Sequence, residues 1–191
     1  MKTTSSLLLI LSFLSCDAFA APPSADQVIA DAKASASAEH KAIFLHFGAS
    51  WCGWCKRLDA FLEHKDVKPV FEKHFVPVKL VVQENQTNKG LENPGADALL
   101  AKLGGPAGLP YSAFLDANGT LIANSKCPSS KGGDGDNIGF PSELAEVDWF
   151  MQMIKKAAPK ISGEELNTIK TALSQKPQVP GSAASAPLKK T

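Results

Sequence analysis

Two cysteines separated by two residues, Cys52 and Cys55, constrain this chain more than any other feature. The short apolar run over residues 41–47 precedes them and is stopped by Gly48, which predicts a buried strand. From the first cysteine onward, apolar residues recur at helical spacing to about residue 64, which predicts a helix. The cysteine pair is therefore expected at a strand-to-helix junction.

A thiol at the start of such a helix is expected to point outward, where free N–H groups and the helix dipole stabilise a thiolate. Sites of this kind lower a cysteine pKa from about 8.5 into the range of roughly 3.5 to 7.5. Cys52 is therefore the candidate nucleophile, and Cys55 is suited to resolve a mixed disulfide. A permanent disulfide and a metal site are the alternatives, but the closed loop is very short and no second closely spaced Cys or His pair is present. No metal ligands are assigned.

Composition places the chain among globular proteins, because 44% of its 191 residues are hydrophobic. Its 20 Lys and Arg residues against 19 Asp and Glu residues give a formal net charge of +1. There is no net field to attract polyanions, so neither nucleic acid nor an anionic membrane surface is expected as a partner.

Residues 1–20 have the three parts of a secretory signal peptide: Lys2, an apolar core and a small-x-small site that ends at Ala20. The core is much shorter than the roughly 20 apolar residues that a membrane-spanning helix needs. Cleavage near Ala20 predicts a periplasmic or secreted protein. The alternative is a lipid anchor at Cys16, although Leu14 is bulky where lipoprotein cleavage sites carry a small residue.

The rest of the chain is expected to divide into three parts. Residues 21–158 are interpreted as the main domain, 159–175 as a C-terminal helical extension and 176–191 as a disordered tail rich in Pro, Ser, Ala and Gly. The expected order of elements in the main domain is helix, strand, helix, strand, helix, strand, strand and helix. The last of these helices is expected to bury Leu144, and an unusually long loop over residues 126–141 precedes it.

The segment 44–56, with the sequence FLHFGASWCGWCK, resembles the active-site segment of the thioredoxin superfamily. The segment 108–111, directly before a predicted strand, resembles that family's cis-proline loop. The resemblance covers roughly residues 25–157. It implies an α/β, thioredoxin-like fold in which helices flank a central mixed β-sheet, here with an added C-terminal helix. It also implies that Pro110 is cis and lies against the disulfide, with the main chain of Leu109 pairing with an extended substrate.

The same resemblance implies a thiol–disulfide oxidoreductase whose redox group is the Cys52–Cys55 disulfide, with no other cofactor. Its partners would be protein or small thiol and disulfide substrates and an external thiol reductant or oxidant. The direction of electron flow stays open, because the Gly53-Trp54 dipeptide differs from that of cytoplasmic thioredoxins. The alternative is a non-catalytic thioredoxin-like binding module or a copper(I)-handling protein.

Five residues are candidates for substrate binding. Trp51 and Trp54 flank the first cysteine and are expected to form an apolar lip for a partner chain, with Gly53 between Trp54 and that cysteine. Leu109 and Pro110 are added through the cis-proline resemblance.

Two further residues are candidates for proton transfer. His46 stands where similar thioredoxins bury an acidic proton acceptor, and it would either accept a proton from Cys55 or pack as a core histidine. Lys79 matches the lysine that pairs with that acid in relatives, so its partner here is in doubt. Cys127 is the unpaired thiol, which could pair with another chain, resolve a mixed disulfide or stay inert.

Overall fold

The computed structural model describes residues 21–105, 108–128 and 135–174. The expected signal peptide, its Cys16 and the expected C-terminal tail lie outside the described residues. Within those three ranges, no helix is both long enough and apolar enough to cross a membrane.

The described residues contain the expected helices and strands in the expected order, with two short additions: a helix before the second strand and a 3-10 helix, labelled η1. The elements are α1 (Ala25–Glu39), β1 (Ala42–Gly48), α2 (Gly53–Leu62), α3 (Lys68–His74), β2 (Phe75–Val81), η1 (Gln86–Leu91), α4 (Ala96–Lys102), β3 (Tyr111–Leu115), β4 (Leu121–Asn124), α5 (Leu144–Ala157) and α6 (Gly163–Ser174).

The four strands form one mixed sheet in the order β2-β1-β3-β4. Strand β1 pairs in parallel with β2, so the chain crosses over through α2 and α3 between them. It pairs antiparallel with β3, and β3 forms the predicted hairpin with β4. Strand β1 is therefore central, and it is buried along its whole length.

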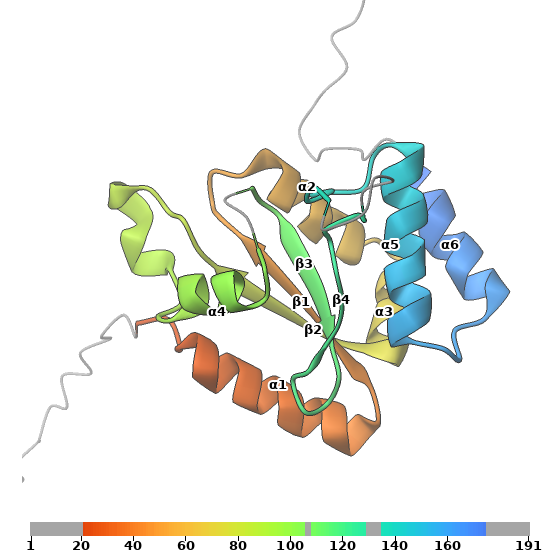
Figure 1. Cartoon of the computed structure of the whole chain (residues 1–191), viewed down its shortest axis with the longest axis horizontal. Coiled ribbons are helices and arrows are strands. Elements are labelled where there is room, and N and C mark those ends of the chain that lie inside the picture. Colours follow the sequence, from red (N-terminus) through yellow and green to blue (C-terminus); the bar gives the residue numbers. More distant parts are fainter. Residues whose placement is uncertain (1–20, 106–107, 129–134, 175–191) are drawn as a thin grey trace, which may run out of the picture.

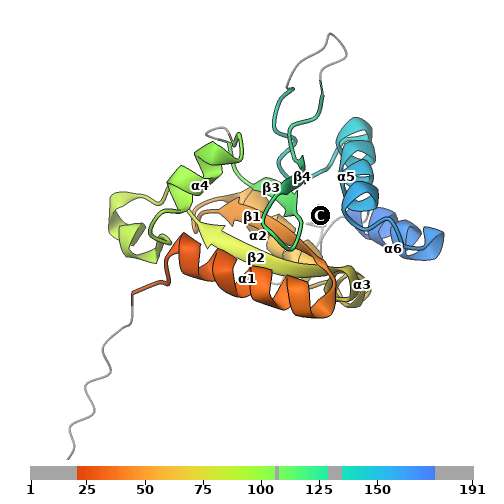
Figure 2. The same cartoon turned by 60° about the horizontal axis from the view of Figure 1, so that its bottom comes forward.

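Helices cover both faces of the sheet (Figures 1 and 2). Successive side chains of β1 point to opposite faces, so Phe44 enters one hydrophobic core while Leu45 and Phe47 enter another. The Phe44 core is shared with α2, α3, α5 and α6, and the second core with α1 and α4. The expected α/β thioredoxin-like architecture, with helices on both sides of a mixed sheet, is confirmed.

Leu144 corrects one expectation about the helix that follows the long loop. It is the first residue of α5, and its side chain is 81% exposed rather than buried. The buried face of α5 begins one turn later, with Val147, and continues through Phe150 and Ile154. The apolar period of the helix was therefore correct, but its first turn extends past the edge of the core.

Candidate active site

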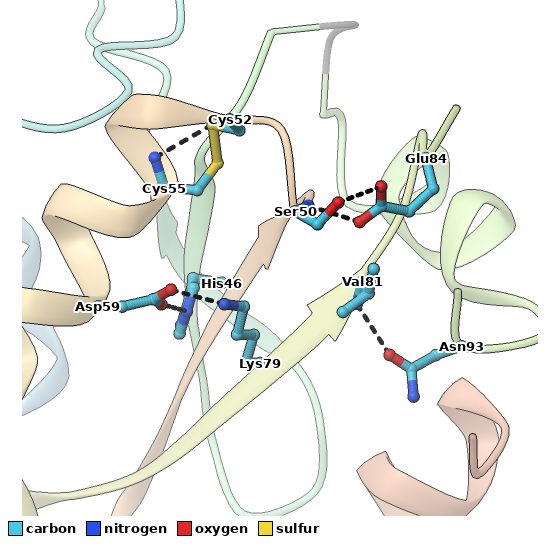
Figure 3. Close-up of polar contacts among 9 residues, drawn as sticks. All are labelled: His46, Ser50, Cys52, Cys55, Asp59, Lys79, Val81, Glu84 and Asn93. Atoms are coloured by element: carbon cyan, nitrogen blue, oxygen red, sulfur yellow. Dashed lines mark hydrogen bonds and ion pairs between the residues drawn. A yellow bond between two sulfur atoms is a disulfide. The ribbon is translucent and has the colours of Figure 1, made fainter. Parts of the chain in front are cut away.

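Cys52 and Cys55 form a disulfide at the N-terminus of α2, with Cα atoms 5.2 Å apart (Figure 3). Cys52 is the N-cap residue, and its Sγ accepts a hydrogen bond from the Cys55 N–H at 3.1 Å. One of the N–H groups that a helix start leaves unpaired thus points at the sulfur of the first cysteine. Because β1 ends at Gly48, the predicted strand-to-helix junction is confirmed.

The prediction that Cys52 points outward is wrong. Cys52 is 4% exposed and Cys55 is fully buried. The disulfide ties the first sulfur to the buried second one, and Leu109 packs against the cluster that Ala49 forms with both cysteines. Leu109 is therefore part of the immediate surroundings of the pair.

Gly48 allows the start of α2 to sit against the end of β1. A Cβ atom at Gly48 would lie 3.2 Å from the Cβ atom and 3.4 Å from the Sγ atom of Cys55. Both distances are shorter than ordinary van der Waals contact between such atoms. The missing side chain therefore makes room for the second cysteine.

The two tryptophans beside the pair are about half exposed, at 54% for Trp51 and 52% for Trp54. The Trp51 indole N–H donates to the carbonyl oxygen of Gln83 at 2.8 Å. The Trp54 ring stacks on Phe140 at a centroid distance of 6.3 Å, and the Arg57 guanidinium lies over both rings. Each tryptophan is thus held at one edge while its remaining surface faces solvent.

The predicted cis-proline loop lies next to the disulfide, because Leu109 packs against the cysteine cluster. The Leu109–Pro110 peptide bond is cis, as the resemblance implied, and Pro110 is buried. Leu109 contacts the cysteine cluster, while Gly53 is exposed and has no neighbouring atom within 4 Å of where a Cβ would stand. The structure therefore brings Trp54, Gly53 and Leu109 together around the pair.

His46 and Lys79 meet at a residue that the sequence analysis missed, Asp59. His46 Nε2 lies 3.0 Å from one carboxylate oxygen of Asp59, and Lys79 Nζ donates to the other at 2.6 Å (Figure 3). Asp59 stands four residues after Cys55, so both lie on one face of α2. That spacing is the signal that could have identified it.

The Asp59 carboxylate is favoured in its ionised form. Burial opposes ionisation, but the hydrogen bonds from His46 and Lys79 hold the pKa of Asp59 below its usual value of 3.8. Lys79 thus has an acidic partner after all, supplied by the helix rather than by the strand.

His46 is buried beside a cavity of about 340 Å³ under α2. Among the described residues, its Nδ1 has no hydrogen-bond partner. The ring stacks on Phe44. His46 lies two residues before Gly48 in β1, so both residues are on the same face of the sheet, and Gly48 lies against the second cysteine. Charged side chains from three elements line the cavity: Asp59, Glu63, Lys68, Glu72 and Lys79.

A buried carboxylate, Glu84, fixes the loop that leads into Cys52. It accepts hydrogen bonds from both the N–H and the hydroxyl of Ser50 (Figure 3). Asn88 donates to the same hydroxyl at 2.9 Å. Strands β1 and β2 are parallel, with Gly48 opposite Val81, so the segments that follow them leave the same edge of the sheet. No sequence motif marked Glu84, because the contact is made between segments far apart in the chain.

Cys127 lies away from this cluster, after β4. It is free and partly exposed, and its Sγ faces the carbonyl oxygen of Pro128 at 3.9 Å. The structure of the described residues gives it no part in the disulfide.

The thioredoxin-like family model matches residues 25–117, which contain the cysteine pair, His46, Asp59 and the cis-proline loop. Comparison with curated proteins finds no match. Several solved structures are similar to this chain. A disulphide isomerase from Xylella fastidiosa Temecula1 is 20% identical, with 89% of this chain and 100% of that chain covered and a TM-score of 0.45.

Two other solved structures give similar values. The oxidised DsbD C-terminal domain of Neisseria meningitidis is 22% identical, with 55% of this chain and 84% of that chain covered and a TM-score of 0.40. The exposed lipoprotein thioredoxin Etrx1 of Streptococcus pneumoniae strain TIGR4 is 21% identical, with 67% and 89% covered and a TM-score of 0.40. The family match over residues 25–117, the mixed sheet and the cysteine pair at the start of α2 thus identify a thioredoxin-like domain in this chain.

Proposed function

We propose that this protein is a thiol–disulfide oxidoreductase in which Cys52 and Cys55 cycle between a dithiol and a disulfide. The observation that carries the proposal is the disulfide at the N-terminus of α2 with the cis Leu109–Pro110 loop beside it. Helix N–H groups stabilise a thiolate at the first position, and a short ring opens with little movement of the chain. The pair itself carries two electrons, so the proposed reaction uses no separate cofactor.

In the reducing direction, the Cys52 thiolate attacks one sulfur of a substrate disulfide and displaces the other as a thiolate. Cys55 then loses its proton and attacks the Cys52 Sγ, which releases the second substrate sulfur and closes the Cys52–Cys55 disulfide. Two electrons pass to the substrate, and two protons complete its thiols. An external thiol donor reduces the pair again, and the same steps in reverse would oxidise a substrate dithiol.

His46 is the proposed acceptor of the Cys55 proton. With its Nε2–H directed at the Asp59 carboxylate, the neutral ring keeps Nδ1 as its basic nitrogen. The second oxygen of that carboxylate is neutralised by Lys79, so Asp59 holds the ring without an unpaired charge. The proton would reach solvent through the cavity under α2, which charged side chains line in part.

The proposed substrates are protein or small disulfides, approached beside Trp51, Trp54 and Leu109. We also propose that the protein acts outside the cytoplasm, because residues 1–20 have the pattern of a signal peptide. The mass of the protein isolated from its native host tests this. A chain that starts at Ala21 supports cleavage near Ala20, a lipid-modified Cys16 supports the anchored alternative, and an uncleaved chain contradicts both.

Trapping the mixed disulfide tests the proposed mechanism. In a Cys55→Ala variant, the second attack cannot occur, so a substrate protein is expected to stay bound covalently through Cys52. The matched controls are Cys52→Ala, which should trap nothing, and Cys127→Ser, which should behave like the wild type. No trapped complex, together with a wild-type protein that reduces no protein disulfide, would contradict the proposal.

A further inference from the structure

The long loop between β4 and α5 folds back beside the cis-proline loop. Its far side returns at Asn137, which forms an isolated antiparallel bridge with Lys126. The Ile138 N–H donates to the carbonyl oxygen of Ser125 at 2.8 Å, which fixes the register of the two sides. A residue far from the cysteines in sequence is thereby brought to the edge of the active site.

The Asn137 side chain binds the cis-proline loop at two points. Its Nδ2 donates to the carbonyl oxygen of Gly108 at 3.0 Å and to that of Pro110 at 3.0 Å. These two carbonyls stand on either side of Leu109, the residue that contacts the cysteine cluster. Both N–H bonds of the amide are thus used on a three-residue segment.

The other end of the amide is fixed as well. Asn137 Oδ1 accepts hydrogen bonds from the Ser125 hydroxyl at 2.6 Å and from the Gly139 N–H at 3.2 Å. The Ser125 hydroxyl in turn accepts a bond from the Ser112 N–H in β3, and both serines are almost fully buried. The Gly139 N–H can only donate, so the amide has one satisfactory orientation.

We propose that Asn137 is a positioning residue that fixes the cis-proline loop for the binding of protein substrates. In such substrates the cysteine that reacts with Cys52 is part of a polypeptide chain. Among the described residues, the N–H and C=O of Leu109 have no hydrogen-bond partner, so they are available to pair with an extended strand. Asn137 holds the flanking carbonyls and thereby sets the direction of the Leu109 main chain. The proposal rests on the proposed function and adds to it a preference for polypeptide disulfides over small ones.

The neighbouring surface agrees with this preference. A cavity of about 420 Å³ lies between the two loops and is lined by Trp54, Leu109, Asn137 and Phe140, among others. Side chains beside a substrate cysteine would enter this space, whereas a small disulfide would reach only the sulfur atoms. The long loop therefore supplies both the clamp and one wall of the space next to the disulfide.

Two substitutions distinguish the hydrogen bonds that Asn137 donates to the cis-proline loop, here called the clamp, from those that hold Asn137 in place. Asn137→Ala removes all four hydrogen bonds, whereas Asn137→Asp keeps the acceptors for Ser125 and Gly139 and removes the two donors to the loop. Asn118→Ala, in the exposed turn of the β3–β4 hairpin, is the matched control. KM and kcat are measured with insulin as the protein disulfide and with hydroxyethyl disulfide as the small one.

For both Asn137 variants, the KM for insulin is expected to rise about tenfold, because two hydrogen bonds that orient the loop are lost. The KM for hydroxyethyl disulfide and the equilibrium constant with glutathione should change less than twofold. An equal loss with both disulfides, no loss with either, or failure of both variants to fold would overturn the proposal. A wild type that is inactive with both disulfides would instead contradict the proposed function.

Discussion

At the scale of single residues, the site differs from that of similar thioredoxins in the position of one acidic side chain. The strand position where similar thioredoxins bury an acid holds His46, and the acid comes from α2 as Asp59. Lys79 binds the carboxylate from β2, so side chains from three elements meet at the partly exposed Asp59. The carboxylate is fixed by both neighbours, and the imidazole is oriented by the carboxylate.

Removing the imidazole should slow the resolving step. We expect His46→Ala to reduce the release of a preformed mixed disulfide at Cys52 by on the order of 10-fold to 100-fold at neutral pH, since general-base catalysis contributes at least that much. The deficit should shrink as the pH rises, because the Cys55 thiol then loses its proton to solvent base without the imidazole. Rapid-quench measurement of release checks this, with His64→Ala as the control. An equal deficit at every pH would indicate a structural role only.

Gly48 offers a test of packing at the disulfide. Because a new Cβ would press on Cys55, Gly48→Ala is expected to lower the free energy of unfolding of the oxidised protein by about 1–3 kcal/mol. Gly53→Ala is the matched control, since no atom lies within 4 Å of its added Cβ, and it should be neutral or slightly stabilising. Urea unfolding measures both, and equal effects would contradict the close approach at Gly48.

Residue-level prediction from the sequence succeeded where the signal was local. The cysteine pair and Pro110 stand in short motifs, so they could be identified before the structure was known. Asp59 had one local signal, its spacing of four residues from Cys55, but Glu84 had none, because its importance comes from contacts with Ser50 on another element. The prediction that Cys52 points outward was wrong because the disulfide ties its sulfur to the buried Cys55.

At the scale of elements, α6 is attached to the domain through a carboxylate. Glu165 accepts hydrogen bonds from Lys73 at 2.7 Å and from the N–H of Ser162 at 2.8 Å, and His74 lies 3.2 Å from it. These contacts lower the pKa of Glu165 from 4.5 to about 2, and the hydrogen bond from Lys73 has the largest effect. The C-terminal helix is thereby joined to α3 as well as to the apolar core.

This attachment should depend on pH. The folded pKa of Glu165 is depressed, so its contribution is complete above about pH 4.5 and is lost as the pH falls through about 2. Glu165→Gln is expected to lower the free energy of unfolding at pH 7 by on the order of 1 kcal/mol. In urea titrations, the difference in free energy of unfolding between this variant and the wild type should become smaller as the pH approaches 2. Glu164→Gln, at an exposed position of the same turn, should show little effect; an equal effect would contradict the assignment.

The order of helices and strands could be predicted because apolar periods are local. Strand β1 and helix α2 lie within one or two residues of their expected bounds. The polar stretch around η1 has no apolar period, so it gave no signal, although it carries residues that hold the active-site loop. Leu144 shows the other limit, because a period does not reveal where the core ends.

At the scale of the whole molecule, the sheet brings the site together at one edge. The ends of β1 and β2 present the cysteine loop beside Glu84, and the long loop after β4 returns to the cis-proline loop. The formal charge of +1 provides no long-range attraction, so recognition must come from these local surfaces. The fold thus brings the disulfide, the proposed proton acceptor and the proposed substrate clamp together from four separate segments.

The most direct test of the account is a redox titration of the full chain in glutathione and dithiothreitol buffers, followed by alkylation and mass measurement. The account predicts one two-electron transition that involves Cys52 and Cys55 and leaves Cys127 unchanged. A midpoint near about −270 mV would indicate a reductase, and one near about −120 mV an oxidase. A pair that stays oxidised throughout, or a transition that requires Cys127, would contradict the central claim.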